Sequence, residues 1–118
     1  MMPQQLESFG LPLLFLLGFI AWRYFRFQKV KGKIPGLLAR GGVVVDVRSR
    51  SEFASGASTG SVNIPLDELE SSLDRFSVDQ PIVLCCASGA RSGMALSLLK
   101  RAGFKNVTNA GPWRNTVT

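Results

Sequence analysis

Hydrophobic residues are concentrated in one run near the N-terminus. The chain carries no charge over residues 8–22, and the apolar stretch continues, with two arginines in it, to Phe27. A membrane-spanning helix requires roughly 20 predominantly apolar residues. We therefore expect a transmembrane helix over residues 9–27, preceded by an N-terminal tail of residues 1–8. The aromatic residues at the end of the run are typical of a membrane–water interface.

Basic residues follow the apolar run directly, whereas a single acidic residue, Glu7, precedes it. Under the positive-inside rule, this asymmetry places the basic side in the cytoplasm. We expect a single-pass protein of the cell membrane, in contact with lipid, with its N-terminus outside and the remainder of the chain cytoplasmic. The basic residues in question are Arg23, Arg26, Lys29, Lys31, Lys33 and Arg40.

Two other interpretations of the apolar run fit less well. In a cleaved signal peptide the basic residues come before the apolar run and a small-x-small cleavage site follows it, and neither feature is present. A helix that lies flat in the interface has one polar face, whereas this run is apolar on all sides.

The rest of the chain changes character. Residues 28–35 form a polar, basic stretch that we interpret as a linker, in which residues 30–34 could form a rudimentary edge strand. Residues 36–118 have the pattern of a folded domain. The β-branched run at residues 43–47 and the apolar run at residues 81–85 are typical of strands buried on both faces.

Helical patterns alternate with these strands. Apolar residues recur at helical spacing in residues 66–76, and residues 92–102 form an amphipathic helix that Gly103 ends. Strands that alternate with helices predict an α/β fold with a mostly parallel sheet flanked by helices. The remaining predicted elements are a helical turn at residues 36–40, a short helix and loop at residues 49–58 capped by Ser51, and short strands at residues 60–65 and 106–109.

The charge and composition exclude several functions. The net charge of +6 comes from 14 basic and 8 acidic residues, but from residue 41 onward the counts are 8 and 7. The domain itself is nearly neutral, so we expect no nucleic-acid binding, which needs a basic face. The absence of histidine excludes a histidine base and histidine metal ligands. Two adjacent cysteines form neither a disulfide scaffold nor a four-cysteine zinc site, so no metal is expected.

The segment with candidate chemistry runs from Cys86 to Ser92, between the strand at residues 81–85 and the following helix. Ligands bind at the carboxyl ends of strands in open parallel sheets. A helix N-terminus and the N–H groups of a tight loop both favour an anion, lower a thiol pKa and so favour the reactive thiolate. We therefore predict a reactive thiol at Cys86, with Arg91 adding positive charge. The small residues that let this loop curl are Ala87, Ser88, Gly89 and Ala90.

At this point the sequence resembles the rhodanese (sulfurtransferase) family, in a single-domain and membrane-anchored form. The resemblance covers about residues 37–113. Its matching segments are residues 44–48 (VVDVR), Glu52 with Phe53, residues 60–65 (GSVNIP), the loop from Cys86 to Ser92, residues 103–107 (GFKNV) and residues 111–113 (GPW).

This resemblance implies a small rhodanese-like domain and sulfur transfer through Cys86. The cysteine would attack a small sulfur donor such as thiosulfate or a persulfide, become a persulfide itself, and pass the outer sulfur to a thiol or to cyanide. A thiol protein is a further candidate acceptor. The backbone N–H groups from Ala87 to Arg91 would stabilise the thiolate and the persulfide, and Arg91 would close the loop and help to bind the donor. No cofactor is expected, since the sulfur would be carried as a covalent persulfide on Cys86.

The resemblance also places Asp46, Arg48 and Glu52 near the loop, where we favour structural ion pairs for them. The sequence departs from the family in two places. Family members often have His-Ile-Pro-Gly where this chain has Ala57-Ser58-Thr59-Gly60, and the first strand and helix of the family give way to the basic stretch. After Trp113 we expect the last helix to be missing or very short.

Three alternatives remain. Counted from Cys85, the spacing Cys-x5-Arg to Arg91 is that of cysteine-dependent phosphatases and arsenate reductases, although strand alternation lets only one of the two cysteines face the loop. A non-catalytic docking module at the membrane is the second alternative. Redox sensing is the third, with Cys85 resolving an oxidised Cys86, but a disulfide between neighbouring residues is strained.

Overall fold

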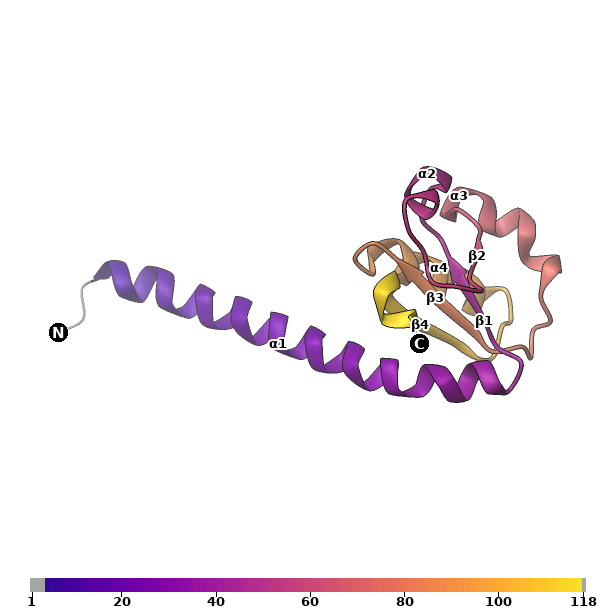
Figure 1. Ribbon diagram of the computed structural model, residues 1–118. Helices are drawn as coiled ribbons and strands as arrows, with labels where there is room; N and C mark the ends of the chain where they lie inside the picture. The colour runs from indigo at the N-terminus through magenta and orange to yellow at the C-terminus, as the bar shows by residue number, and fades with distance from the viewer. Residues whose placement is uncertain (1–3, 118) are drawn as a thin grey trace.

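The computed structural model describes the backbone of residues 4–117 and the side chains from Gly10 onward. A long N-terminal helix leads into a four-stranded parallel sheet with the strand order β2-β1-β3-β4 (Figure 1). The elements are α1 (Gln4–Ala39), β1 (Val43–Asp46), α2 (Arg50–Ala54), β2 (Val62–Asn63), α3 (Leu66–Leu69), the 3-10 helix η1 (Glu70–Arg75), β3 (Ile82–Cys86), α4 (Ala90–Arg101), β4 (Val107–Pro112) and the 3-10 helix η2 (Trp113–Thr116). The predicted α/β class and parallel sheet are confirmed.

Helix α1 is continuous through the segment expected to be a linker. Residues 28–35 are helical, so the edge strand suggested for residues 30–34 is wrong, whereas the domain division that assigns residues 28–35 to a linker remains a prediction. The reason is tertiary: Ile34 and Leu37 are buried against the sheet, and that packing stabilises a helix that the polar composition did not predict. The boundaries proposed for tail, span and domain remain predictions.

By length and composition, the part Gly10–Ala39 of α1 is a candidate membrane span, and none of its most apolar stretch is buried against the rest of the protein. A signal sequence near an N-terminus meets the same criteria. The orientation of this helix across a membrane therefore remains a prediction.

The sheet separates two hydrophobic clusters. One face packs on α3 and α4, and its buried residues include Leu84, Cys86 and Leu99. The opposite face packs on the C-terminal part of α1 and on η2, and its buried residues include Val83 and Cys85. Alternation along β3 therefore directs the two adjacent cysteines to opposite faces.

The other predicted elements are present with adjusted limits. The helix expected over residues 66–76 divides into α3 and η1, and the last helix is the short η2. The cap of α2 is Ser49 and not Ser51 as predicted. Ser49 accepts a hydrogen bond from the backbone N–H of Glu52, and the Glu52 carboxylate accepts one from the N–H of Ser49, which together form a capping box.

The direction of the chain brings one edge of the sheet back toward the middle of α1. After Ala39 the chain reverses at Gly41 and Gly42, where Gly41 adopts a φ of +89°. Strand β1 then leads away from α1 at an angle, and of the four strands β4 and β3 are the ones that lie against this helix (Figure 1). Because all four strands are parallel, their carboxyl ends lie at the same edge of the sheet, and the loop after β3 and the end of β4 contact Arg23 and Phe27 in the middle of α1.

Candidate active site

Cys86 is the last residue of β3 and is 1% exposed. The backbone N–H of Gly89 donates to Cys86 Sγ at 2.9 Å, and the Oγ of Ser92 lies 3.3 Å from the same sulfur. The loop can curl this tightly because Gly89 adopts a φ of +108°, a conformation that residues with a Cβ rarely adopt. Gly89 is also the N-cap of α4, so the sulfur lies at a helix N-terminus.

These surroundings favour the ionised thiol. Burial raises the pKa of Cys86, but hydrogen bonds from the Ser92 hydroxyl and from the backbone N–H groups of Ser92, Gly89 and Ser88 outweigh burial, and the pKa lies below its ordinary value. The thiolate is the nucleophilic form of cysteine. Cys86 therefore has the properties expected of a reactive cysteine.

Ser92 links the sulfur to β4. Its hydroxyl donates to Asn109 Oδ1 at 2.7 Å while its oxygen faces Cys86. Because serine has a single hydroxyl proton, it can bond Asn109 while the thiol is protonated, or turn that proton toward the sulfur once the thiol ionises. In the second case Asn109 Oδ1 still accepts the N–H of Gly111, at 2.9 Å, so no buried acceptor is left unpaired.

Cys85 lies in a different environment. Its thiol is buried on the face of the sheet that carries α1, and burial, with Asp46 as the next cause, raises its pKa to about 12. A thiol with this pKa is protonated at physiological pH. The geometry therefore counts against the phosphatase spacing that begins at Cys85, because this sulfur neither faces the loop nor ionises. Both cysteines are free.

Arg91 is engaged by α2. Its Nη1 and Nη2 donate to Glu52 Oε1 at 2.7 Å and Oε2 at 2.9 Å, and within the described residues its side chain bonds to no other group. The Arg91 guanidinium, followed by hydrogen bonds from Ser49, lowers the pKa of Glu52 to about 2. This ion pair connects the start of α4 to α2. The Arg91 guanidinium, which was expected to help to bind the sulfur donor, is bonded to the Glu52 carboxylate.

Asp46 and Arg48 form a second, buried pair at the end of β1. The Asp46 carboxylate accepts hydrogen bonds from Arg48 Nε at 3.0 Å and Nη2 at 2.7 Å, and it raises the pKa of Arg48. The guanidinium also stacks 4.8 Å from the ring centroid of Trp113 and donates to the carbonyl of Gly56 at 2.7 Å. This pair lies on the Cys85 side of the sheet, where it ties the loop after α2 to the C-terminal residues.

The predicted loop residues divide into two groups. Gly89 supplies a donor to the sulfur, whereas Ala87, Ser88 and Ala90 are exposed. Sequence reasoning included Ser92 in the loop segment but gave it no role at the sulfur, and it missed Asn109 of β4 and Arg23 and Phe27 of α1 as members of the site. The position of Ser92, in the first turn of the helix after the loop, was an available signal.

Candidate metal ligands do not gather at this site. Among the side chains of residues 10–117, no three His, Cys, Asp or Glu residues come together as a metal centre requires.

Comparison with known proteins agrees with this geometry. A family model, the rhodanese-like domain, matches residues 31–110. This is more than half of the chain, so the chain belongs to the rhodanese family. It is 35% identical over 98 residues to the thiosulfate:glutathione sulfurtransferase of Homo sapiens, covering 70% of this chain and 85% of that one. It is 31% identical over 84 residues to a thiosulfate sulfurtransferase of Pseudomonas entomophila, covering 68% and 77%.

Solved structures show the same fold. A human single-domain sulfurtransferase superposes with a TM-score of 0.65 at 32% identity, over 71% of this chain and 88% of that one. A rhodanese from E. coli superposes with a TM-score of 0.60 at 26% identity, over 63% and 89%. The chain spans only 37%, 52% and 60% of the length of three other relatives, two from Bacillus subtilis and one from Schizosaccharomyces pombe. Rhodanese-type sulfurtransferase homology is thus shown, and the reaction of this particular chain is a proposal.

Proposed function

We propose that this protein is a sulfurtransferase that carries sulfur as a persulfide on Cys86. The observation that supports this most directly is the set of hydrogen bonds to the Cys86 sulfur from Gly89 and Ser92. These donors stabilise a negative sulfur, which is the form that must attack the donor and the form that must leave when sulfur is passed on.

The reaction consists of two displacements. The Cys86 thiolate attacks the sulfane sulfur of thiosulfate, the sulfur–sulfur bond of the donor breaks, and sulfite departs with the electron pair. A thiolate or cyanide then attacks the outer sulfur of the Cys86 persulfide, forms a new persulfide or thiocyanate, and regenerates the Cys86 thiolate. Both steps are two-electron exchanges, so no external oxidant or reductant is consumed.

The substrate classes follow from this chemistry and from the relatives. Two relatives are named for thiosulfate, and one of them for glutathione. We extend to this chain a small sulfane donor, thiosulfate or a persulfide, and a thiol or cyanide acceptor, including thiol proteins.

We further propose that α1 anchors the protein in the cell membrane, with the N-terminus outside and the rhodanese domain cytoplasmic. The apolar stretch of α1 and the basic residues after it support this orientation. Because the catalytic loop lies beside the end of that stretch, catalysis would take place at the level of the lipid headgroups. Protein that washes off isolated membranes at alkaline pH would contradict the anchor.

The test of the reaction is intact-protein mass spectrometry of the full chain in detergent micelles after exposure to thiosulfate. We expect the mass to increase by one sulfur atom in the wild type and in Cys85→Ala, but not in Cys86→Ala. Addition of cyanide should remove this sulfur. A folded wild type that gains no sulfur would contradict the proposal and favour the docking module, whereas sulfur lost in Cys85→Ala alone would move the chemistry to the other cysteine.

A further inference from the structure

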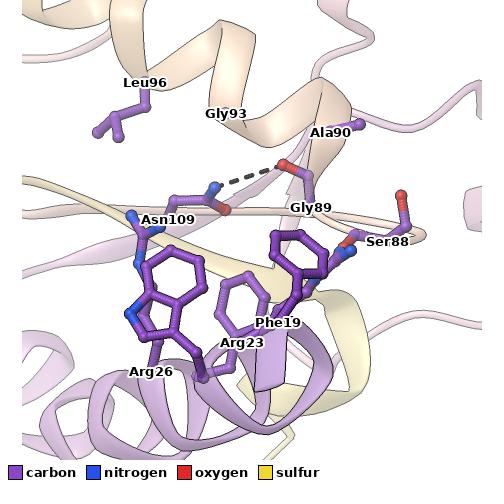
Figure 2. A pocket seen from close by; sticks show the side chains of 11 residues that line it. Phe19, Arg23, Arg26, Ser88, Gly89, Ala90, Gly93, Leu96 and Asn109 are labelled. Carbon is purple, nitrogen blue, oxygen red and sulfur yellow. Dashed lines mark hydrogen bonds between the residues drawn. The ribbon is translucent and has the colours of Figure 1, made fainter. Parts of the chain in front are cut away.

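The helix that carries the candidate membrane span also contacts the catalytic loop. Arg23 of α1 donates a hydrogen bond to the backbone carbonyl of Ser88. Arg23 and Arg26 project from α1 into a groove of about 430 Å³ that is walled on its other side by the loop and by α4 (Figure 2). Arg23 approaches the loop from the side that faces α1, whereas the Cys86 sulfur lies on the opposite, inner side of the loop.

The bond from Arg23 bears on the group that contacts the catalytic sulfur. The Ser88 carbonyl and the Gly89 N–H belong to the same planar peptide unit, and in a trans peptide the two point in opposite directions. Arg23 holds the carbonyl from outside while the N–H donates to Cys86 Sγ at 2.9 Å inside. A cation on the carbonyl also polarises the peptide and strengthens the N–H as a donor.

A second contact from α1 fixes the same turn. The ring of Phe27 fills the space left by Gly89 and Gly111, two glycines with positive φ. A Cβ on Gly111 would lie 2.7 Å from ring atoms of Phe27, and a Cβ on Gly89 would lie 3.3 Å from the same ring. The guanidinium of Arg23 lies 5.5 Å from the centroid of the Phe27 ring, so the two residues hold one another against the loop.

The peptide on the other side of Gly89 is held from α4 and from β4. The Gly89 carbonyl accepts the backbone N–H of Gly93 at 2.9 Å and Asn109 Nδ2 at 3.4 Å (Figure 2). On the Ser88 side it is Arg23 that bonds the carbonyl, and glycine itself imposes little steric preference on the adjoining peptide. The loop conformation that directs an N–H at the sulfur is therefore maintained by α4 and β4 on one side of Gly89 and by α1 on the other.

We propose that Arg23 is a positioning residue of the active site, which orients and polarises the Ser88–Gly89 peptide so that its N–H stabilises the sulfur anion of Cys86. The inference rests on the proposed function for its consequence in catalysis, but its effect on the thiol can be measured without sulfur transfer. It makes α1 a part of the active site as well as a candidate anchor. The span and the catalytic loop are thereby coupled through one hydrogen bond.

Other charged groups near the loop must be kept constant in a test. Arg91 of α4 is paired with Glu52 of α2, and Arg48 at the end of β1 is paired with Asp46 on the Cys85 side of the sheet. None of them bonds to the Ser88 carbonyl within the described residues. A change confined to Arg23 therefore leaves these charges in place.

The matched control is Arg26, which lines the same groove and has the same charge. Its guanidinium lies 5.3 Å from the ring centroid of Trp22, and within the described residues it forms no hydrogen bond to the loop. Arg26→Gln thus removes a nearby charge without touching the peptide. Arg23→Gln removes both the charge and the bond, and Arg23→Lys keeps the charge with a single-point donor.

The experiment measures the rate of alkylation of Cys86 by iodoacetamide against pH, on the full chain in micelles with Cys85→Ala as background. We expect Arg23→Gln to raise the apparent pKa of Cys86 enough to slow the reaction roughly tenfold at a pH below that pKa. Arg26→Gln should match the background, and Arg23→Lys should lie between. Thermal unfolding of each variant verifies that the fold persists.

The inference would be overturned if the pKa of Cys86 were the same in Arg23→Gln as in Arg26→Gln. It would also be overturned if the pKa of Cys86 differed from the background in both Arg23→Lys and Arg23→Gln but were equal in these two variants. Persulfide loading by thiosulfate is measured in parallel. A background protein that forms no persulfide, but whose thiol pKa depends on Arg23, would refute the proposed function and leave the positioning role standing. Normal persulfide loading together with a thiol pKa that does not depend on Arg23 would support the proposed function and refute the positioning role.

Discussion

Cys85 and Cys86 are neighbours in β3, yet their sulfurs lie on opposite faces of the sheet and their pKa values move in opposite directions. Burial raises the pKa of Cys85 to about 12, whereas hydrogen bonds at the end of the strand outweigh burial at Cys86 and lower its pKa. The difference does not come from residue type. It comes from where the strand ends, because only Cys86 borders the loop whose N–H groups turn inward.

The turn at Gly89 yields a first prediction. Gly89→Val should abolish persulfide loading while the domain remains folded, because Gly89 has a φ of +108° and a Cβ there would lie 3.3 Å from Arg23, Gly111 and Phe27. Strain of this kind costs about 1–3 kcal/mol. Loading is followed by mass spectrometry and unfolding by heat.

The control for this turn is Gly60→Val. Gly60 also has a positive φ, +82°, but no atom lies within 4 Å of its Cβ position. It should lose stability and still load sulfur. Full loading in Gly89→Val would mean that the loop does not stabilise the sulfur in the way described.

Ser92 is expected to tune the thiol. Ser92→Ala removes the hydroxyl 3.3 Å from the Cys86 sulfur, so the pKa of Cys86 should rise toward its ordinary value. The thiolate fraction near neutral pH should fall, and the rate of persulfide formation should fall with it, because fewer molecules carry the nucleophilic form. The measurement is the pH profile of Cys86 alkylation, which should move to higher pH. Ser97→Ala, in the same helix but exposed, should leave the profile in place.

The Glu52–Arg91 pair should contribute stability that depends on pH. Because the pKa of Glu52 is lowered from 4.5 to about 2 in the folded protein, the contribution is fully present above 4.5 and is lost as the pH falls toward 2. Glu52→Gln should therefore flatten the loss of thermal stability over that interval. Glu70→Gln, at an exposed position on η1, should retain the acid dependence of the wild type. An unchanged slope in Glu52→Gln would mean that the pair does not stabilise the fold.

The buried Asp46–Arg48 pair should be costly to break. Asp46→Ala leaves the Arg48 guanidinium, which is 4% exposed, without its carboxylate, and such losses amount to about 3 kcal/mol or more. Denaturation by urea should show a lower midpoint. Asp79→Ala removes the exposed partner of Lys105 and should change the free energy of unfolding by less than about 1 kcal/mol. Similar effects of the two substitutions would argue against a structural role for Asp46.

Much of the domain could be predicted from local pattern. The β-branched run of β1, the apolar run of β3 and the amphipathic residues of α4 are each determined by residues close in sequence, and their alternation indicates a parallel sheet. The same holds for the loop that begins at Cys86, since small residues between a buried strand and a helix indicate an anion-binding turn. Ser49 was missed as the cap of α2 because several serines lie within hydrogen-bond reach of the same helix start.

Other features required contacts between distant segments. Residues 28–35 have the composition of a linker, but they are helical because Ile34 and Leu37 pack against the sheet. Arg91 has the pattern of a substrate ligand and is engaged by Glu52, 39 residues away in sequence. No local signal distinguishes these outcomes, because burial and ion pairing depend on which surfaces meet.

The sequence by itself determined the fold class, the family resemblance and the identity of the loop, because each depends on periodicity or on spacing within a few residues. Only the tertiary structure decided which protons and peptide groups surround the sulfur. Ser92 is brought to Asn109, and Arg23 to Ser88 across 65 residues, by the packing of α1 and β4 around the end of β3. Such contacts join surfaces that are brought together by the burial of apolar faces. The residues that pair across them therefore cannot be predicted from local sequence.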